Sequence, residues 1–180
     1  MRRNIHYKPS KSASILSGII ACAMGVFGLF ILAYYNLIGA SFNGVTMGII
    51  FCMLATCNSG SHPGNVWPIM VGYVAASYIA EFVCGLTGAE HTLMANAQAI
   101  VIGLCFANGL SPVTGVYGWL AGVLFGMIHY TFVTCVPLLH GAFCLYNGGF
   151  TAGFTCFLFI PVLEHFCKTK QQRKELKAGK

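Results

Sequence analysis

Residues 15–37 read ILSGIIACAMGVFGLFILAYYNL, an apolar run with no charged side chain. A helix of about 20 apolar residues crosses the hydrocarbon core of a bilayer, so this run is long enough to span it. The run is too long for the hydrophobic region of a signal peptide, and it ends in aromatic residues without a small-residue cleavage motif. The stretch therefore predicts a retained first transmembrane helix.

The rest of the chain has the same apolar character. Its 180 residues are 57% hydrophobic and only 8% charged, whereas soluble domains carry roughly 25% charged residues. A soluble protein of this size needs more polar side chains than these to cover its surface. The composition excludes a soluble enzyme, a DNA-binding module and a disordered regulator.

The positive charge is confined to the two ends of the chain. All 10 Lys and Arg residues lie in residues 2–11 and 168–180. Basic segments beside long apolar runs are typical of the cytoplasmic side of a membrane protein, whereas nucleic-acid binding needs a basic folded face. We expect a multi-pass protein of the inner cell membrane with both termini cytoplasmic, hence an even number of crossings, and no nucleic-acid partner. The predicted organisation is a basic tail (1–14), one transmembrane domain (15–165) and a second basic tail (166–180).

Glycine, proline, asparagine and serine divide the apolar sequence into six segments. The second, fourth and sixth are shorter than the roughly 20 residues that a spanning helix needs. We therefore predict an all-α, polytopic membrane helix bundle of about six transmembrane segments, two or three of them short, broken or re-entrant. The expected segments are residues 15–37, 45–57, 66–86, 93–107, 115–136 and 149–163.

Three glycines recur at a spacing of four residues in the fifth segment: Gly118, Gly122 and Gly126. Small residues at this spacing let helix backbones approach closely in lipid, where no hydrophobic effect draws helices together. We expect these glycines to pack helices; the other interpretation is a smooth solute path along the glycine face. The cysteines form no C-x-x-C pair and resemble small buried hydrophobic residues, so we expect neither a metal nor a cofactor.

Polar residues at the segment breaks are the candidates for a substrate path. Breaks expose backbone groups, which membrane proteins tolerate only where protein covers them or they line a cavity. Similar Gly- and Asn-rich stretches precede two short segments, and such pairs often indicate a transport site. An acid inside a membrane segment is costly and often functional. The candidates are Asn43, His62, Asn65, Glu81, His140 and Asn147. We expect His129, deep in the fifth segment, to bond to a neighbouring helix.

Several motifs resemble those of a known family. They include FNGV (42–45), HPGNVWP (62–68), GLSPVTG (109–115) and LHGAFCLYNGGFTAG (139–153). The chain resembles the C-terminal half of an uncharacterised bacterial membrane family, domain of unknown function 1576, whose members are about twice as long. Ala142 and Gly148 depart from its pattern, where a glycine and an asparagine are expected. The resemblance implies a polytopic helical architecture and no particular activity.

No catalytic motif appears in the sequence, so we do not expect an enzyme. We predict a channel or secondary transporter for an unidentified small solute. The alternative is a non-transporting structural or assembly subunit of a membrane complex. A membrane enzyme is the third class, and it would require His129 or His140 to converge with a Cys or Glu. Because broken helices must be covered, we expect the lipid bilayer and either a homo-oligomer or a complementary membrane subunit as partners.

Overall fold

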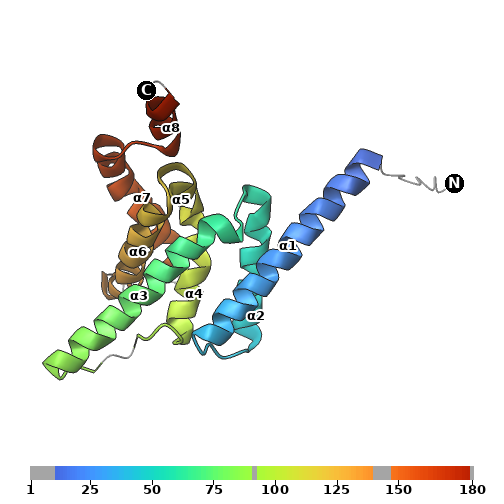
Figure 1. Ribbon diagram of the computed structural model, residues 1–180. Helices are drawn as coiled ribbons and strands as arrows, with labels where there is room; N and C mark the ends of the chain where they lie inside the picture. Colours follow the sequence, from blue (N-terminus) through green and yellow to red (C-terminus); the bar gives the residue numbers. More distant parts are fainter. Residues whose placement is uncertain (1–10, 91–92, 140–146, 179–180) are drawn as a thin grey trace.

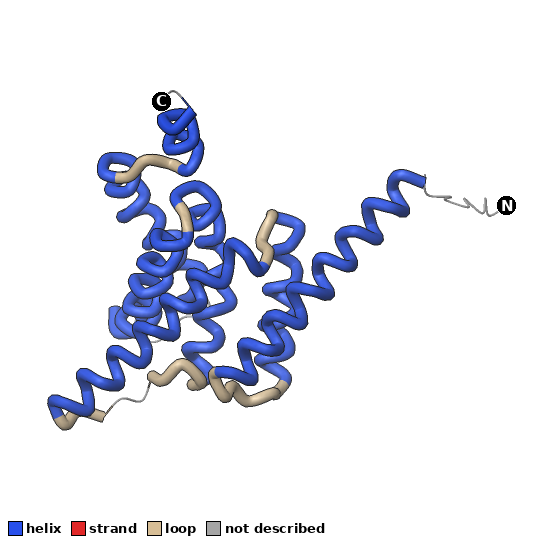
Figure 2. The backbone as a smooth tube through the Cα atoms, viewed as in Figure 1, coloured by secondary structure: helices blue, strands red, loops and turns tan. Residues whose placement is uncertain are grey.

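The computed structural model describes residues 11–90, 93–139 and 147–178, and within these ranges the chain is helical and contains no strand (Figure 2). Figure 1 labels the principal helices. In chain order the elements are α1 (Lys11–Leu37), α2 (Gly44–Ala55), the 3-10 turn η1 (Thr56–Ser59), α3 (Pro63–Thr87), α4 (Gln98–Ala107), the 3-10 turn η2 (Asn108–Leu110), α5 (Ser111–Tyr117), α6 (Trp119–Leu139), α7 (Asn147–Phe166) and α8 (Lys170–Ala178).

Most of these helices have the length and composition of membrane spans. Among the described residues, five stretches are long and apolar enough to cross a membrane, and Gly44–Ser59 is a shorter apolar helix. This pattern fits a membrane protein and confirms the predicted all-α fold class. The five stretches are Ile15–Leu37, Pro63–Thr87, Gln98–Tyr117, Trp119–Val136 and Gly148–Ala178.

Successive helical passes run in alternating directions (Figure 1). We call the end at which α1 begins and α8 lies the tail end, and the end at which α1 stops and α4 begins the loop end. The turns η1 and η2 both lie toward the tail end. Both ends of the described chain therefore lie at one end of the bundle, as an even number of passes requires; that this is the cytoplasmic side stays a prediction.

One of the three predicted short segments is confirmed as short and another is broken. Helix α2 has 12 residues, so it extends about 18 Å, against a hydrocarbon core about 30 Å thick. Helix α4 has 10 residues, but its pass continues through η2 and α5, and Gln98–Tyr117 is long and apolar enough to cross a membrane. The prediction that the sixth segment is short is wrong, because α7 has 20 residues. The fourth segment starts at Gln98 rather than at residue 93, since the chain before it forms turns.

The fifth segment is not one helix from residue 115. Gly118 has a φ of +113°, a conformation that side-chain-bearing residues rarely adopt, and it separates α5 from α6. Residues 108–114, expected as a loop, are instead helical and extend α4 through η2 into α5. Gly118 therefore acts as a helix break and does not belong to the packing face of α6.

Helices α3 and α6 form the most extensively packed pair of the described elements. An added Cβ at Gly72 of α3 would lie 2.0 Å from the carbonyl oxygen of Val123, and one at Gly126 of α6 would lie 2.1 Å from that of Ile69. The two backbones thus touch at glycines. By contrast, the first half of α1 diverges from the bundle and exposes Ile15 and Ile19 (Figure 1).

Candidate functional site

Asn43 organises the loop end of α2. Its Oδ1 accepts hydrogen bonds from the backbone N–H groups of Val45 and Thr46 at 2.9 and 3.1 Å, which are otherwise free donors at a helix start. Its amide also pairs with Gln98, with N–O distances of 3.3 and 3.5 Å. Since Gln98 is the first residue of α4, this pair joins the starts of the two short helices.

His62 and Asn65 lie at the tail end, where α3 begins. The N–H of Gly64 donates to His62 Nδ1 at 3.1 Å, and the N–H of His62 donates to Asn65 Oδ1 at 2.9 Å. Asn65 Nδ2 donates to the carbonyl of Gly60 at 2.9 Å. These side chains are engaged in capping α3, and α2 separates them from Asn43.

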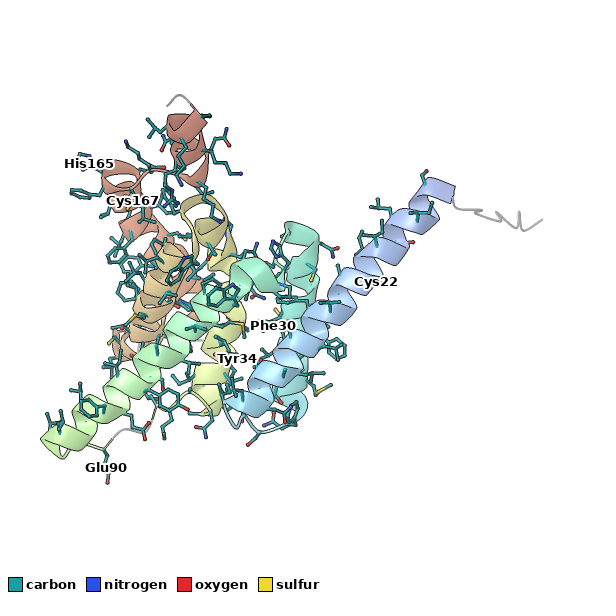
Figure 3. The ribbon with its side chains drawn as sticks, viewed as in Figure 1. Cys22, Phe30, Tyr34, Glu90, His165 and Cys167 are labelled. Carbon is teal, nitrogen blue, oxygen red and sulfur yellow. The ribbon has the colours of Figure 1, made fainter. Side chains whose placement is uncertain are left out.

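Glu81, another predicted path residue, is not brought together with these. Glu81 is half-buried in the second half of α3, which extends past the body of the bundle beside exposed Phe82. Glu90, just beyond α3, lies at the same outer tip (Figure 3). His140 lies outside the described residues, and Asn147 is the first residue of α7, with a side chain that is likewise outside the description.

The glycines of α6 contact neighbouring helices directly. An added Cβ at Gly122 would lie 2.3 Å from Thr114 Oγ1, and one at Gly126 would meet the backbone of α3. These two positions leave no room for a solute along that face. Gly118 instead faces α8, since an added Cβ would lie 3.5 Å from Arg173 Nη2.

His129 is fully buried and ties α6 to α4. Its Nε2 lies 3.1 Å from the carbonyl oxygen of Gly103, which confirms the predicted bond to a neighbouring helix. From the other side, Tyr73 of α3 donates its hydroxyl hydrogen to the carbonyl of Ile100 at 2.9 Å. The short helix α4 is thus held by two side chains of the tightly packed α3–α6 pair.

A buried polar layer lies where α2 and α4 end. Asn108 Nδ2 donates to Thr56 Oγ1 at 3.1 Å, and Thr56 Oγ1 donates to the carbonyl of Met53 at 2.6 Å. The hydroxyls of Ser61 and Ser111 lie 3.2 Å apart, and both side chains are buried. The two short helices are therefore joined at their ends as well as at their starts.

One cavity opens against this layer. Its volume is about 410 Å³, and it is partly open to the surface of the chain. Asn108 lines it with 2% of the residue exposed, and among the described residues Asn108 Oδ1 has no hydrogen-bond partner. We call this space the helix-end cavity; its lining residues are Cys52, Thr56, Cys105, Phe106, Asn108, Gly109, Gly149, Ala152, Gly153 and Cys156.

The position of α7 explains why a cavity forms there. An added Cβ at Gly148, in the first turn of α7, would lie 2.4 Å from the ring of Phe106 near the end of α4. Helix α7 therefore begins beside the point where α4 ends, and its early residues Gly149 and Ala152 line the cavity. The final turns of α2 and α4 and the first turns of α7 meet at one place.

A second cavity of about 340 Å³ continues along α7 toward the tail end. It shares Gly109 and Cys156 with the helix-end cavity and reaches Glu164. Beyond it, Lys170 Nζ donates to the carbonyl of Thr114 at 2.9 Å, and Arg173 donates to that of Tyr117. His165 and Cys167 mark the same end of the molecule (Figure 3). Basic side chains of α8 thus cap the negative end of α5.

The helix-end cavity carries no charged side chain among its described lining residues. Three cysteines line it, yet no three His, Cys, Asp or Glu side chains in the described part of the chain are placed to hold a metal ion. The arrangement offers hydrogen-bonding groups and a polarisable wall.

Sequence reasoning missed Asn108, Thr56 and Gln98. Asn108 begins the stretch NGLSPVT, whose composition is typical of a turn, so its burial was not expected. The sequence feature that could have identified Asn108 is its position directly after the apolar run that ends at Ala107. Thr56 and Gln98 gave no signal of their own, because each matters only through a partner more than 50 positions away.

The comparisons with known proteins give one match. The model of the family described as "Protein of unknown function (DUF1576)" matches residues 14–165, which is most of the chain. No curated protein and no solved structure matches this chain. The matched range contains α2 through α6, all but the ends of α1 and α7, and the helix-end cavity. The chain belongs to the DUF1576 family.

Proposed function

We propose that this chain is a channel or secondary transporter that carries a small solute across the inner cell membrane, and that it is not an enzyme. The observation that best supports this proposal is the helix-end cavity, which is bounded by the ends of α2 and α4 and the start of α7. In lipid, helix ends away from the surface are tolerated where protein covers them or they line a cavity, and transporters use such ends to bind their cargo.

The path that we propose runs from the loop end, past the Asn43–Gln98 pair, through the helix-end cavity and along α7 to Glu164. The two cavities share Gly109 and Cys156, which supports a continuous groove over the second part of this route. The basic tails are then cytoplasmic, so the groove toward Glu164 would face the cytoplasm. In this proposal His62 and Asn65 stabilise α3 at that side and do not touch the solute.

A partner is part of the proposal. The helix-end cavity is partly open, and its wall residues Cys52 and Gly153 are exposed. An open groove facing lipid would leak or fill with acyl chains, so we propose that a second copy or a complementary membrane subunit closes it.

A blocking substitution tests the path. Gly153 lines the cavity and an added Cβ there meets nothing within 4 Å, so a larger side chain can be placed at the cavity wall without a clash at its Cβ. Gly85 of α3 is equally open but does not line the cavity, so it serves as the matched control. We expect proteoliposomes with Gly153→Phe to fall to the solute flux of protein-free vesicles, while Gly85→Phe matches the unmodified protein.

Two results would count against this function. One is a panel of polyols, amides and monovalent ions in which no solute moves faster than through protein-free vesicles. The other is an equal flux through Gly153→Phe and Gly85→Phe. Either result would favour the alternative, a structural or assembly subunit whose glycines only pack helices.

A further inference from the structure

We propose that the solute bound in the helix-end cavity is a small uncharged molecule that both donates and accepts hydrogen bonds, and that Asn108 Oδ1 accepts one of them. This inference rests on the proposed function and adds the chemical class of the cargo. It starts from two features of one cavity: Asn108, whose buried Oδ1 has no partner among the described residues, lines it, and so do the first turns of α7.

The acceptor comes from Asn108. Its amide is oriented by the bond from Nδ2 to Thr56 Oγ1, and Oδ1 has no partner within the part of the chain that the structure describes. A buried amide oxygen without a partner costs free energy, so native structures retain few of them, and such a group is best explained by a bound molecule or water. A ligand that donates an N–H or O–H group would satisfy it.

The donors come from α7. The first turn of any α-helix presents backbone N–H groups with no partner inside the helix, and Gly149 lies in that turn while lining the cavity. An added Cβ at Gly149 would lie 3.4 Å from the ring of Phe106, so that ring borders this glycine in the cavity wall. A solute that fits the site therefore needs an acceptor atom as well as a donor group.

The residues that line the helix-end cavity argue against a charged solute. No lining residue among those described is acidic or basic, and between residues 12 and 167 the sequence has no Lys or Arg. An ion would lose its hydration without gaining a counter-charge, which costs several kcal/mol in a low-dielectric site. The helix ends do not replace a counter-charge, because the positive start of α7 opposes the negative ends of α2 and α4.

The volume of the helix-end cavity limits the size of the solute. The cavity of about 410 Å³ lies near the lower end of the range of small-molecule sites. The thiols of Cys52, Cys105 and Cys156 and the ring of Phe106 supply apolar, polarisable walls. Small amides and polyols combine the required donor, acceptor and modest size.

Three planar probes of similar size separate charge from shape: urea, guanidinium and nitrate. We expect proteoliposomes of the unmodified protein to take up urea and glycerol faster than protein-free vesicles, and to show no change of membrane potential with guanidinium or nitrate gradients. A membrane potential driven by guanidinium or nitrate, without uptake of urea or glycerol, would overturn the proposal that the solute is uncharged. It would not contradict the proposal that the chain translocates a solute. The absence of flux for every probe would instead refute the proposed function itself.

A substitution then tests the role of Asn108. We expect Asn108→Ala to lower urea and glycerol flux about five- to tenfold, the loss of one hydrogen bond to the solute. Asn58, an exposed asparagine of η1 that does not line the cavity, gives the control Asn58→Ala with unchanged flux. Equal flux in both variants would overturn the assignment of Asn108. If Asn108→Ala does not assemble, the uptake experiment with the unmodified protein still tests the proposed class of solute.

Discussion

Replacing Gly126 with alanine tests the packing that positions α4 and the cavity. An added Cβ at this position would lie 2.1 Å from the carbonyl oxygen of Ile69 and 3.0 Å from the backbone nitrogen of Tyr73. Ordinary van der Waals contact begins near 3.4 Å. Because both neighbours are backbone atoms, no side chain can rotate away, and α3 and α6 must separate by about 1.3 Å, the difference between the two distances.

The cost follows from this displacement. Overpacking a filled interface costs about 1–3 kcal/mol, whereas Gly→Ala in an open helix position gains about 0.5–1 kcal/mol. Gly85 of α3 provides the open position, since an added Cβ there meets nothing within 4 Å. We expect Gly126→Ala to unfold more easily than Gly85→Ala, with a difference in unfolding free energy of about 1–4 kcal/mol.

Tryptophan fluorescence reports the unfolding of the two helices. The protein has two tryptophans, Trp67 in α3 and Trp119 in α6. Denaturant titration of detergent-solubilised protein, with both variants measured under the same conditions, gives the difference. Equal midpoints and slopes for Gly126→Ala and Gly85→Ala would refute the close contact between the two backbones.

Two further substitutions test the anchoring of the short helices. Asn43→Ala removes the cap of α2 and should lower the unfolding free energy by about 1 kcal/mol, whereas Asn43→Ser keeps a capping oxygen and should recover most of it; equal losses would argue against the cap. His129→Leu removes the bond to Gly103 and should cost about 1 kcal/mol in the same titration. Exposed His165→Leu is its control, and an equal effect of both would argue against the buried bond.

Much of the architecture was predictable from the sequence because membrane helices obey a simple composition rule. The apolar run that ends at Leu37 and the run from Val66 to Leu86 gave helices close to their expected bounds. Where glycine and proline interrupt a run, composition alone does not distinguish a loop from a bent helix. Residues 108–114 look like a turn, yet the chain continues there as helix up to Gly118.

The candidate site was harder to predict because its parts are distant in sequence. Thr56, Asn108 and Gly149 come from three separate passes, and only the packing of α7 beside the end of α4 brings them together. Asn43 was predicted as a substrate-path residue, and the structure shows it as the cap of α2; its partner Gln98 gave no local signal. Polar residues that cap helices and polar residues that line cavities look alike in a single sequence.

The central claim is that solute passes through the helix-end cavity, and thiol modification tests it most directly. Cys156 is half-buried and lines both cavities along α7, whereas Cys22 is exposed on the diverging half of α1 and lines neither (Figure 3). We compare two variants, each retaining one of these as its sole cysteine, after reaction with a charged methanethiosulfonate. We expect modification at Cys156 to abolish solute flux and modification at Cys22 to leave it unchanged. Full flux through protein that is completely modified at Cys156 would contradict it.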